Sequence, residues 1–538
     1  MIKKLFTYLM IVLAGLLLLS TMARAQTWGS YEEADKRIEQ YRKGDFTIIV
    51  TDEAGNIISN AAIEVNMKKH AFLFGSEVKA GLVFGPYAIE QYRATFLELF
   101  NSGTFSSDLK WGPWEGEWDQ SRFKTSEYLI PGNPFDRERT MGALAWFKEN
   151  DLFFRAHGLI WPKWNYMPLF LEPYHTNSAG LPEVIINRIR DVTSATKDYV
   201  YEWDVVNEPA TCHDVMDIFG DSIMVDWFET AREELPDCKL FINENGILLT
   251  AENLIKVEQE IQYLLDHNAP LDGIGIQGHM EKDSQLDPAI IFYRISRFSK
   301  FGLDIRITEF DHEGINEQQQ AQYLHDFFIT VFSHPGVSGI QMWGFWEGSH
   351  WRPQRALYRK DWSIKPNGLA YKDLVFNRWW SNFQGNTDSQ GKFQGRGFLG
   401  SYEIKVIHHD STFSKTFDLE KNSNEVIFQL KPEFSTSIRA TDSNHWGEFM
   451  LQQNYPNPFN ATTAIVYVLP RDGFVNLSIY NLLGKTVRCL VNRSLSAGRY
   501  ISNWDGADES GNNVASGLYL CKLESEFFQK INKMTLLK

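Results

Sequence analysis

The chain has 538 residues, which excludes a single small module and predicts about two to four domains. Hydrophobic residues make up 43% and charged residues 22%, so the chain can bury a core and is neither disordered nor fibrous. The 53 Lys and Arg against 68 Asp and Glu leave a net charge of −15, which argues against nucleic acid as a partner. The 17 Trp residues and an aromatic content of 14% exceed the needs of a core and indicate stacking surfaces, for which sugar rings are one candidate ligand.

Residues 1–25 have the pattern of a signal peptide. Lys3 and Lys4 precede an apolar stretch from Leu5 to Leu19, and Ala23-Arg24-Ala25 forms a small-x-small cleavage site. A membrane anchor is the alternative, but the apolar stretch is shorter than a span usually requires. We expect a protein that is secreted or held at the cell surface after export through the periplasm, with no membrane span in the mature chain.

The four cysteines are too few for a disulfide scaffold and lack the close spacing of a zinc site. Cys212 with Cys238, and Cys489 with Cys521, could each pair in an oxidising compartment, and buried free thiols are the alternative. The sequence has no HExxH motif, no GxSxG motif and no GxGxxG motif after a strand. We therefore expect neither a metal nor an organic cofactor.

Short apolar strands alternate with amphipathic helices through most of the chain. A hairpin is expected first, at 45–67, where alternating apolar residues flank a Gly-Asn turn. Eight strands follow, at 71–78, 100–105, 153–161, 202–208, 239–245, 273–279, 304–311 and 339–345. Apolar residues recur at helical spacing in the segments 86–100, 251–268 and 315–332. The pattern predicts an α/β fold, a (β/α)₈ TIM barrel with its site at the carboxyl ends of the strands, over residues 26–383.

The rest of the chain has the pattern of β structure. Residues 384–432 are expected to form a small β appendix with Gly and Asn turns, and 433–447 a polar linker. Residues 448–538 contain alternating strands at 464–470, 475–484, 485–491, 499–506 and 517–524, which predict a C-terminal β-sandwich.

Polar residues interrupt the apolar runs near the ends of the barrel strands, and two glutamates stand out among them. Glu208, in "WDVVNEP", ends the fourth strand and Glu309, in "ITEFD", ends the seventh, so both should point into one cleft. Hydrolysis of a glycosidic bond with retention needs one carboxyl group to protonate the leaving oxygen and a second to attack the anomeric carbon, about 5–5.5 Å apart. The alternative is that each glutamate is a structural carboxylate in an ion pair.

The ordered segments "FNSGTFSSDLKW", "RAHGLIW", "WDVVNEP", "GIGIQGH", "ITEFD" and "WGFWEGSHW" resemble the glycoside hydrolase family 10 endo-β-1,4-xylanases. The resemblance implies a general acid/base at Glu208, a nucleophile at Glu309, and xylan or xylo-oligosaccharides as substrate. It also implies substrate-binding residues: Asn207 for the sugar 2-hydroxyl, Gln277 and His279 beside Glu309, Lys110, His157 and Trp161 on the glycone side, and Trp343 and Trp351 around the sugar nearest the bond.

Two positions depart from the family pattern. Members usually carry Glu-Asn before the "xxKW" of the second strand, where this chain has Ser106 and Ser107. The usual His after the third strand is Pro162. These departures bear on the glycone subsites and leave the carboxylate pair intact.

The C-terminal segment resembles the type A sorting domain of proteins exported by the type IX secretion system. "NYPNPFN", the "GLY" strand and a Lys-rich end carry that resemblance. It implies the type IX secretion machinery as a partner, and a carbohydrate-binding module is the alternative for this domain.

Two further functions remain open at this point. One is another β-1,4-glycanase, acting on glucan or cellulose with the same two glutamates. The other is a catalytically silent glycan-binding barrel, against which the intact Glu208 and Glu309 argue.

Overall fold

The structure is a computed structural model that describes residues 28–116, 136–408, 411–422, 424–430, 449–454, 456–460, 462–481, 484–525 and 528–537. The chain divides into two compact units, Met1–Lys431 and Pro432–Lys538, and each is described by itself. The predicted signal peptide and the predicted linker lie outside the described residues.

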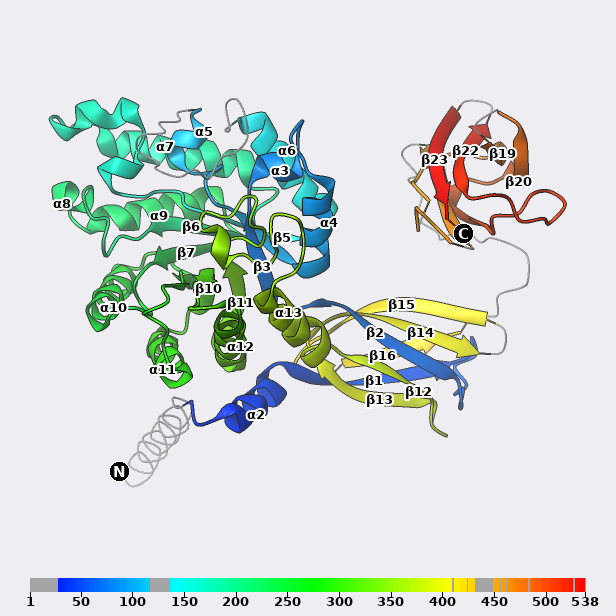
Figure 1. The fold of residues 1–538 in the computed structure, drawn as a ribbon, viewed down its shortest axis with the longest axis horizontal. Coiled ribbons are helices and arrows are strands. Elements are labelled where there is room, and N and C mark those ends of the chain that lie inside the picture. The colour runs from blue at the N-terminus through cyan, green and yellow to red at the C-terminus, as the bar shows by residue number, and fades with distance from the viewer. Residues whose placement is uncertain are drawn as a thin grey trace, which may run out of the picture. The chain divides into compact units, whose positions relative to one another are not determined.

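In the described part of the first unit, eight parallel strands close into a barrel (Figure 1). They are β3 (Leu73–Val78), β4 (Ser102–Phe105), β5 (Phe153–Ala156), β6 (Glu202–Asn207), β7 (Lys239–Glu244), β8 (Gly273–Ile276), β10 (Asp304–His312) and β11 (Val337–Met342). Strand β11 pairs with β3, so that Gly339 lies opposite Leu73 and the sheet has no open edge. The predicted (β/α)₈ barrel is confirmed, and each strand falls where the apolar runs placed it. The short strand β9 (His279–Met280) pairs with the end of β10.

Helices surround the barrel and connect its strands (Figure 1). The connecting helices are α4 (Glu90–Leu99), α6 (Arg137–Glu149), α7 (Leu181–Thr196), α9 (Ser222–Glu234), α10 (Ala251–Asp266), α11 (Pro288–Phe298), α12 (Glu317–Ser333) and α13 (Pro366–Lys372). Shorter or flanking helices are α2 (Tyr31–Tyr41), α3 (Ala80–Val83), α5 (Trp111–Trp114) and α8 (Met216–Phe219).

Helix α10 illustrates why these segments are helical. The Thr250 side chain caps its first turn by accepting the Asn253 N–H. Leu254, Val257, Ile261 and Leu264 recur at helical spacing and are buried. The helix therefore places one apolar face against the barrel.

Charged side chains fill the barrel interior below the site. Glu202 on β6 accepts hydrogen bonds from Arg155 on β5 and Arg306 on β10, and Arg155 also pairs with Asp204. Strands β7 and β8 separate β6 from β10, so the Glu202–Arg306 contact runs through the interior. All four side chains are buried, and buried charges are tolerated because each is paired.

The first two strands of the chain form, but not as the expected hairpin. Strand β1 (Lys43–Thr51) pairs with β13 (Lys392–Phe398) and β16 (Asn424–Gln429). Strand β2 (Ala62–His70) belongs to a second sheet with β12 (Asn382–Asn386), β14 (Gly400–His408) and β15 (Ser411–Leu419).

The sequence pattern explains this correction. Phe46, Ile48 and Val50 on β1, and Ile63 and Val65 on β2, are buried at every second position. Each strand therefore has one apolar face to cover, and both faces are buried when the strands lie in opposite sheets. The strands from 384–432 complete both sheets of this sandwich.

The second unit contains two sheets around a core of its own. One has β17 (Met450–Leu451), β18 (Thr463–Leu469) and β21 (Gly498–Trp504), and the other has β19 (Gly473–Asn481), β20 (Thr486–Leu495), β22 (Gly517–Ser525) and β23 (Phe528–Leu536). Leu477, Trp504 and Leu523 are fully buried between them. The predicted C-terminal β-sandwich is confirmed.

In the described part of the chain, which includes all four cysteines, each cysteine is a free thiol, and all but Cys489 are buried. None of the described helices has the length and apolar character that a bilayer crossing requires.

Candidate active site

The site lies at the carboxyl ends of β6, β7, β8 and β10, on the opposite side of the ion-pair layer from the start of the strands. Both strands that carry a predicted catalytic glutamate change register before they end. The register of β6 against β7 shifts between Asp204 and Val206, and that of β10 against β11 shifts between Ile307 and Phe310. Such irregularities re-aim side chains and are common beside active sites.

Glu309 is a buried carboxylate surrounded by donors. Its Oε1 accepts a hydrogen bond of 2.8 Å from Asn243 Nδ2, and its Oε2 lies 3.1 Å from His279 Nε2. Burial raises the pKa of Glu309, but the charges of His157, His279 and Lys110 and the His279 hydrogen bond outweigh it. The pKa is lowered overall, so this group is held as an ionised carboxylate.

His279 bridges Glu309 and a second buried carboxylate, Asp311. The His279 Nδ1 atom lies 2.8 Å from Asp311 Oδ1. Burial lowers the pKa of His279, but Asp311 and Glu309 together raise it to about 10, so both ring nitrogens carry protons at neutral pH. Asp311 also accepts hydrogen bonds from Trp351 Nε1 at 2.5 Å and Arg355 Nη1 at 2.8 Å, which fix its orientation.

Glu208 occupies a different environment, at the start of a tight turn and partly exposed. Its φ of 56° lies in the left-handed region, which is uncommon for a residue with a side chain. Its Oε1 accepts a 2.6 Å hydrogen bond from Gln277 Nε2, and its Oε2 lies 3.6 Å from the Cys212 thiol. A partly exposed carboxyl group can exchange a proton with substrate or water, which the enclosed Glu309 is less suited to do.

Two residues connect the glutamates to each other. The Asn243 backbone oxygen accepts the Glu208 N–H at 2.7 Å, while its side chain donates to Glu309. The Gln277 side chain donates to Glu208, and its backbone oxygen accepts the Glu309 N–H at 2.9 Å. We expected Gln277 to lie beside Glu309; its backbone does, and its side chain contacts Glu208.

Asn243 belongs to the site but was not predicted from the sequence. Its side chain also donates to Asn207 Oδ1 at 2.8 Å and accepts from Thr308 Oγ1 at 2.6 Å. Space for it comes from Gly275 on β8, where an added Cβ would lie 2.4 Å from Asn243 Oδ1. Asn243 and Glu244 end β7, and Asn245 follows directly.

The remaining predicted residues lie around this centre. The ring of Trp343 contacts His157 and His279 edge-on, at centroid distances of 5.2 and 6.1 Å. His157 Nδ1 lies 2.9 Å from Asp204 Oδ2 and 3.8 Å from Glu309 Oε1. The structure therefore brings histidine, tryptophan and carboxylate groups together at one end of the barrel.

The glycone-side residues form an adjoining cluster. The Lys110 ammonium lies 4.6 Å from the centre of the Trp161 ring, and Tyr166 stacks on Trp161 at 3.7 Å. Ser106 and Ser107 are buried beyond nine-tenths, and Ser106 Oγ has no hydrogen-bond partner among the described residues.

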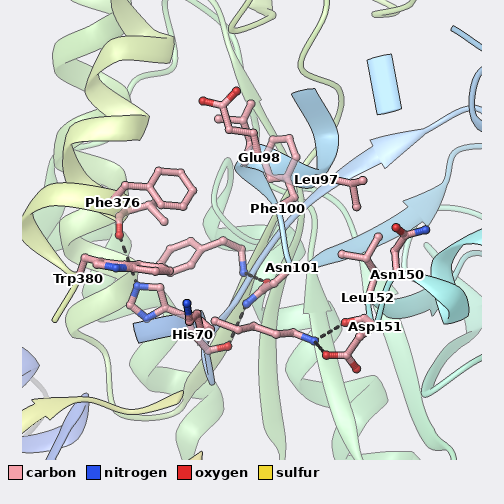
Figure 2. Close-up of a pocket in the computed structure, with 15 residues that line it drawn as sticks. His70, Leu97, Glu98, Phe100, Asn101, Asn150, Asp151, Leu152, Phe376 and Trp380 are labelled. Carbon is pink, nitrogen blue, oxygen red and sulfur yellow. Dashed lines mark hydrogen bonds and ion pairs between the residues drawn. The ribbon is translucent and has the colours of Figure 1, made fainter. Parts of the chain in front are cut away.

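A separate pocket of about 210 Å³ lies at the opposite end of the barrel, where the strands begin (Figure 2). His70, Asn101 and Asp151 line it with Phe376 and Trp380. Its polar groups bond to one another: Asn101 Nδ2 donates to the His70 backbone oxygen, and Asp151 pairs with Lys69. None of the predicted site residues lines this pocket, so it is distinct from the candidate site.

The described residues at the carboxyl ends supply an ionised, enclosed carboxylate, a more exposed carboxyl group, and amide and imidazole donors. Across the described ranges, no group of three or more His, Cys, Asp or Glu residues is arranged to hold a metal ion. These groups suit a reaction in which the ionised carboxylate attacks a carbon atom of the substrate and the second carboxyl group protonates the leaving group.

Comparisons with known proteins agree with this chemistry. The family model of Glycosyl hydrolase family 10 matches residues 63–375, and that of the FlgD Ig-like domain matches residues 461–526. Anti-sigma-I factor RsgI6 of Acetivibrio thermocellus is 28% identical over 398 residues, which cover 73% of this chain and 49% of that protein. Endo-1,4-beta-xylanase 1 of Arabidopsis thaliana is 27% identical over 397 residues, which cover 73% of this chain and 40% of that protein. The chain thus spans about half of these relatives or less.

A solved structure shares the fold. Xylanase 10B from Thermotoga petrophila RKU-1 in complex with xylobiose is 24% identical, with a TM-score of 0.50, over 57% of this chain and 95% of that one. The family match covers more than half of the chain and includes both Glu208 and Glu309. The chain therefore belongs to glycosyl hydrolase family 10.

Proposed function

We propose that this protein is an endo-β-1,4-xylanase that hydrolyses internal bonds of xylan with retention of configuration. Glu309 is the nucleophile and Glu208 the general acid/base. The observation that carries the proposal is the pair of bridges through Asn243 and Gln277, since each of these residues hydrogen-bonds both glutamates.

The first step forms a glycosyl-enzyme. Ionised Glu309 attacks the anomeric carbon, and Glu208 gives its proton to the departing glycosidic oxygen. Asn207 Oδ1 accepts from Asn243, which directs the Asn207 amide nitrogen to donate to the sugar 2-hydroxyl. Such a contact stabilises the transition state when it strengthens as charge develops on the ring.

The second step releases the sugar. Glu208, now ionised, takes a proton from water, and the oxygen of that water attacks the anomeric carbon and displaces Glu309. Both groups return to their starting protonation states. The two inversions give a product with the configuration of the substrate.

Aromatic side chains support a sugar chain as ligand. Trp343 and Trp351 pack around His279, beside the nucleophile. Flat apolar rings stack on the faces of sugars, and xylan offers a continuous series of such faces.

The comparisons leave two other functions to be tested. One relative is named as an anti-sigma factor, so family membership alone does not separate an enzyme from a silent glycan-binding barrel. The ionised Glu309 beside a second carboxyl group favours hydrolysis. Another β-1,4-glycanase activity would use the same groups on glucan or cellulose.

A substrate panel with two variants tests the proposal. The protein should release sugar from xylan faster than from mixed-linkage glucan or cellulose, and proton NMR should show the β anomer first. Glu309→Ala should abolish turnover, whereas Glu208→Ala should still cleave substrates with good leaving groups and be rescued by azide. An α product or an active Glu309→Ala protein would overturn the assignment.

We propose further that the second unit is an address for type IX secretion of an exported enzyme. It has its own buried core, and part of it resembles the FlgD Ig-like domain. A chain that ends at Lys431 should hydrolyse xylan at close to the full rate but accumulate in the periplasm of its host. Unchanged export of that chain would refute the address, and lost binding to insoluble xylan would favour a carbohydrate-binding module.

A further inference from the structure

The turn from Glu208 to Cys212 holds the acid/base residue in an unusual backbone conformation. Glu208 has a φ of 56°, and its backbone oxygen accepts the N–H groups of Thr211 and Cys212 at 3.1 and 2.7 Å. This region is unfavourable for a residue with a side chain, so the conformation persists only when its surroundings hold it.

The end of β7 supplies those surroundings through three consecutive residues. Asn243 accepts the Glu208 N–H, Glu244 Oε1 accepts the Ala210 N–H at 2.9 Å, and Asn245 Nδ2 lies 3.3 Å from Thr211 Oγ1. Glu244 is fully buried, and it is the one residue of these three with an ionisable side chain.

Glu244 faces a second carboxyl group, that of Glu260 on α10. Each of the two side chains acts on the pKa of the other, and the Oε2 atom of each is buried without a hydrogen-bond partner among the described residues. Two carboxylates cannot face each other without a proton between them unless a cation neutralises them.

The two cations that lower the pKa of Glu260, Lys256 and His213, are paired with other carboxylates. Lys256 pairs with Glu252 at 3.0 Å, and His213 pairs with Asp217 and Asp221 at 2.8 and 2.9 Å. Burial raises the pKa of Glu244 well above its ordinary value and that of Glu260 to about 7. The pair therefore holds a proton, and a protonated carboxyl group can donate to its neighbour while its other oxygen keeps the Ala210 N–H.

We propose that the Glu244–Glu260 pair is a positioning element for Glu208: it anchors the turn through Ala210 and keeps the acid/base carboxyl group aimed at the leaving oxygen. This inference rests on the proposed function. Glu244 does not touch the reacting atoms, so its effect should be confined to steps in which Glu208 transfers a proton.

The dependence of kcat/KM on the leaving group tests the positioning role of Glu244. Cleavage of a phenyl xylobioside requires a proton from the acid, because phenolate is a poor leaving group. Cleavage of a 2,4-dinitrophenyl xylobioside does not, because 2,4-dinitrophenolate leaves without a proton. Glu244→Leu should lower kcat/KM on the phenyl substrate by about tenfold to 100-fold more than on the dinitrophenyl substrate, because a small misplacement of a catalytic group costs that much. Glu244→Gln can still accept from Ala210 and donate to Glu260, so it should restore the ratio of the wild-type protein.

Two controls make the result decisive. Glu258→Leu, on the same helix, removes the partner of Arg297 and should cost stability while leaving the ratio of the two substrates unchanged. Glu208→Ala should show the steepest leaving-group dependence of the series. If Glu208→Ala does not, the proposed function fails; if it does and Glu244→Leu changes both substrates equally, only the positioning role fails.

Glu260→Leu covers the case in which Glu244→Leu does not fold. It leaves the turn itself untouched and removes the group that fixes Glu244, so the substrate ratio should move in the same direction by a smaller factor. A folded Glu260→Leu protein with the wild-type ratio would also overturn the proposal.

Discussion

Replacing Asp311 by asparagine should weaken the nucleophile by changing the charge of His279. Asp311 and Glu309 raise the pKa of His279 to about 10 against the opposing effect of burial. Without the Asp311 charge, burial is opposed by Glu309 alone, so the pKa of His279 should fall and the neutral ring should become populated. A neutral imidazole has a single N–H to share between Glu309 and the new amide, so Glu309 loses part of the interaction that keeps it ionised.

The magnitude follows from the hydrogen bond that changes. A hydrogen bond to a charged group contributes about 1.5–3 kcal/mol, and a neutral His279 that shares its one N–H between two acceptors loses about half of that from its contact with Glu309, about 0.8–1.5 kcal/mol. That corresponds to about a fourfold to tenfold fall in kcat/KM at neutral pH.

The pH profile shows in which direction the pKa of Glu309 changes. Glu309 acts as the ionised form and its pKa is lowered in the folded protein. Asp311→Asn should raise that pKa, so the acidic limb of kcat/KM moves to higher pH and activity is lost first in acid, while the alkaline limb stays in place. The profile is measured on xylohexaose between about pH 4 and pH 9.

Asp304 provides a matched control at the other end of β10. It pairs with Lys239 at 2.8 Å, far along the strand from the site. Asp304→Asn should lower the unfolding temperature without moving the acidic limb. An unmoved acidic limb in Asp311→Asn would refute the role given to His279.

Two further changes test the amide and the glycone side. Asn243→Ala removes a donor from both Glu309 and Asn207 and should lower kcat/KM on xylan by about tenfold to 100-fold, with circular dichroism to show that the fold survives; near-normal activity would contradict its bridging role. Ser106 and Ser107 are too short to replace the usual long side chains, and the loss of one or two hydrogen bonds costs about 1–3 kcal/mol, so the protein should prefer polymer to xylotriose. Ser106→Glu with Ser107→Asn should narrow that preference, and efficient xylotriose cleavage by the unchanged protein would show that another segment supplies this subsite.

The barrel and its two glutamates could be predicted because each depends on local sequence. An apolar run that ends in a polar residue indicates a barrel strand and its carboxyl end at once. Glu208 and Glu309 end such runs on β6 and β10. The pairing partners of β1 could not be predicted in the same way, because β13 and β16 lie more than 300 residues further along the chain.

Asn243 shows a different limit. Asn243 and Glu244 end strand β7 and Asn245 follows it, and the sequence does not show which of these three polar residues faces the barrel interior. Its contacts with Asn207, Thr308 and Glu309 depend on the register of three strands and on the space that Gly275 leaves. Glu244 could not be predicted for the same reason, because its neighbour Glu260 lies on helix α10.

The register shifts in β6 and β10 explain how one barrel interior serves two purposes. Arg306, before the shift in β10, and Thr308, within it, point inward, to Glu202 and Asn243; Glu309, also within it, and Asp311, beyond it, point to His279. In a strand with unbroken alternation, the interior face would continue through residues 308 and 310, and Glu309 would point away from the cleft.

Strand β6 shows the same change of phase. Glu202 and Asp204 point inward to the ion-pair layer, and Asn207 does so beyond the shift, to Asn243. Strands β6 and β10 thus both change along their length from a layer of paired charges to a layer of candidate catalytic groups. Every member of the charged layer has an ion-pair partner, and the site is built on the ends of the same strands.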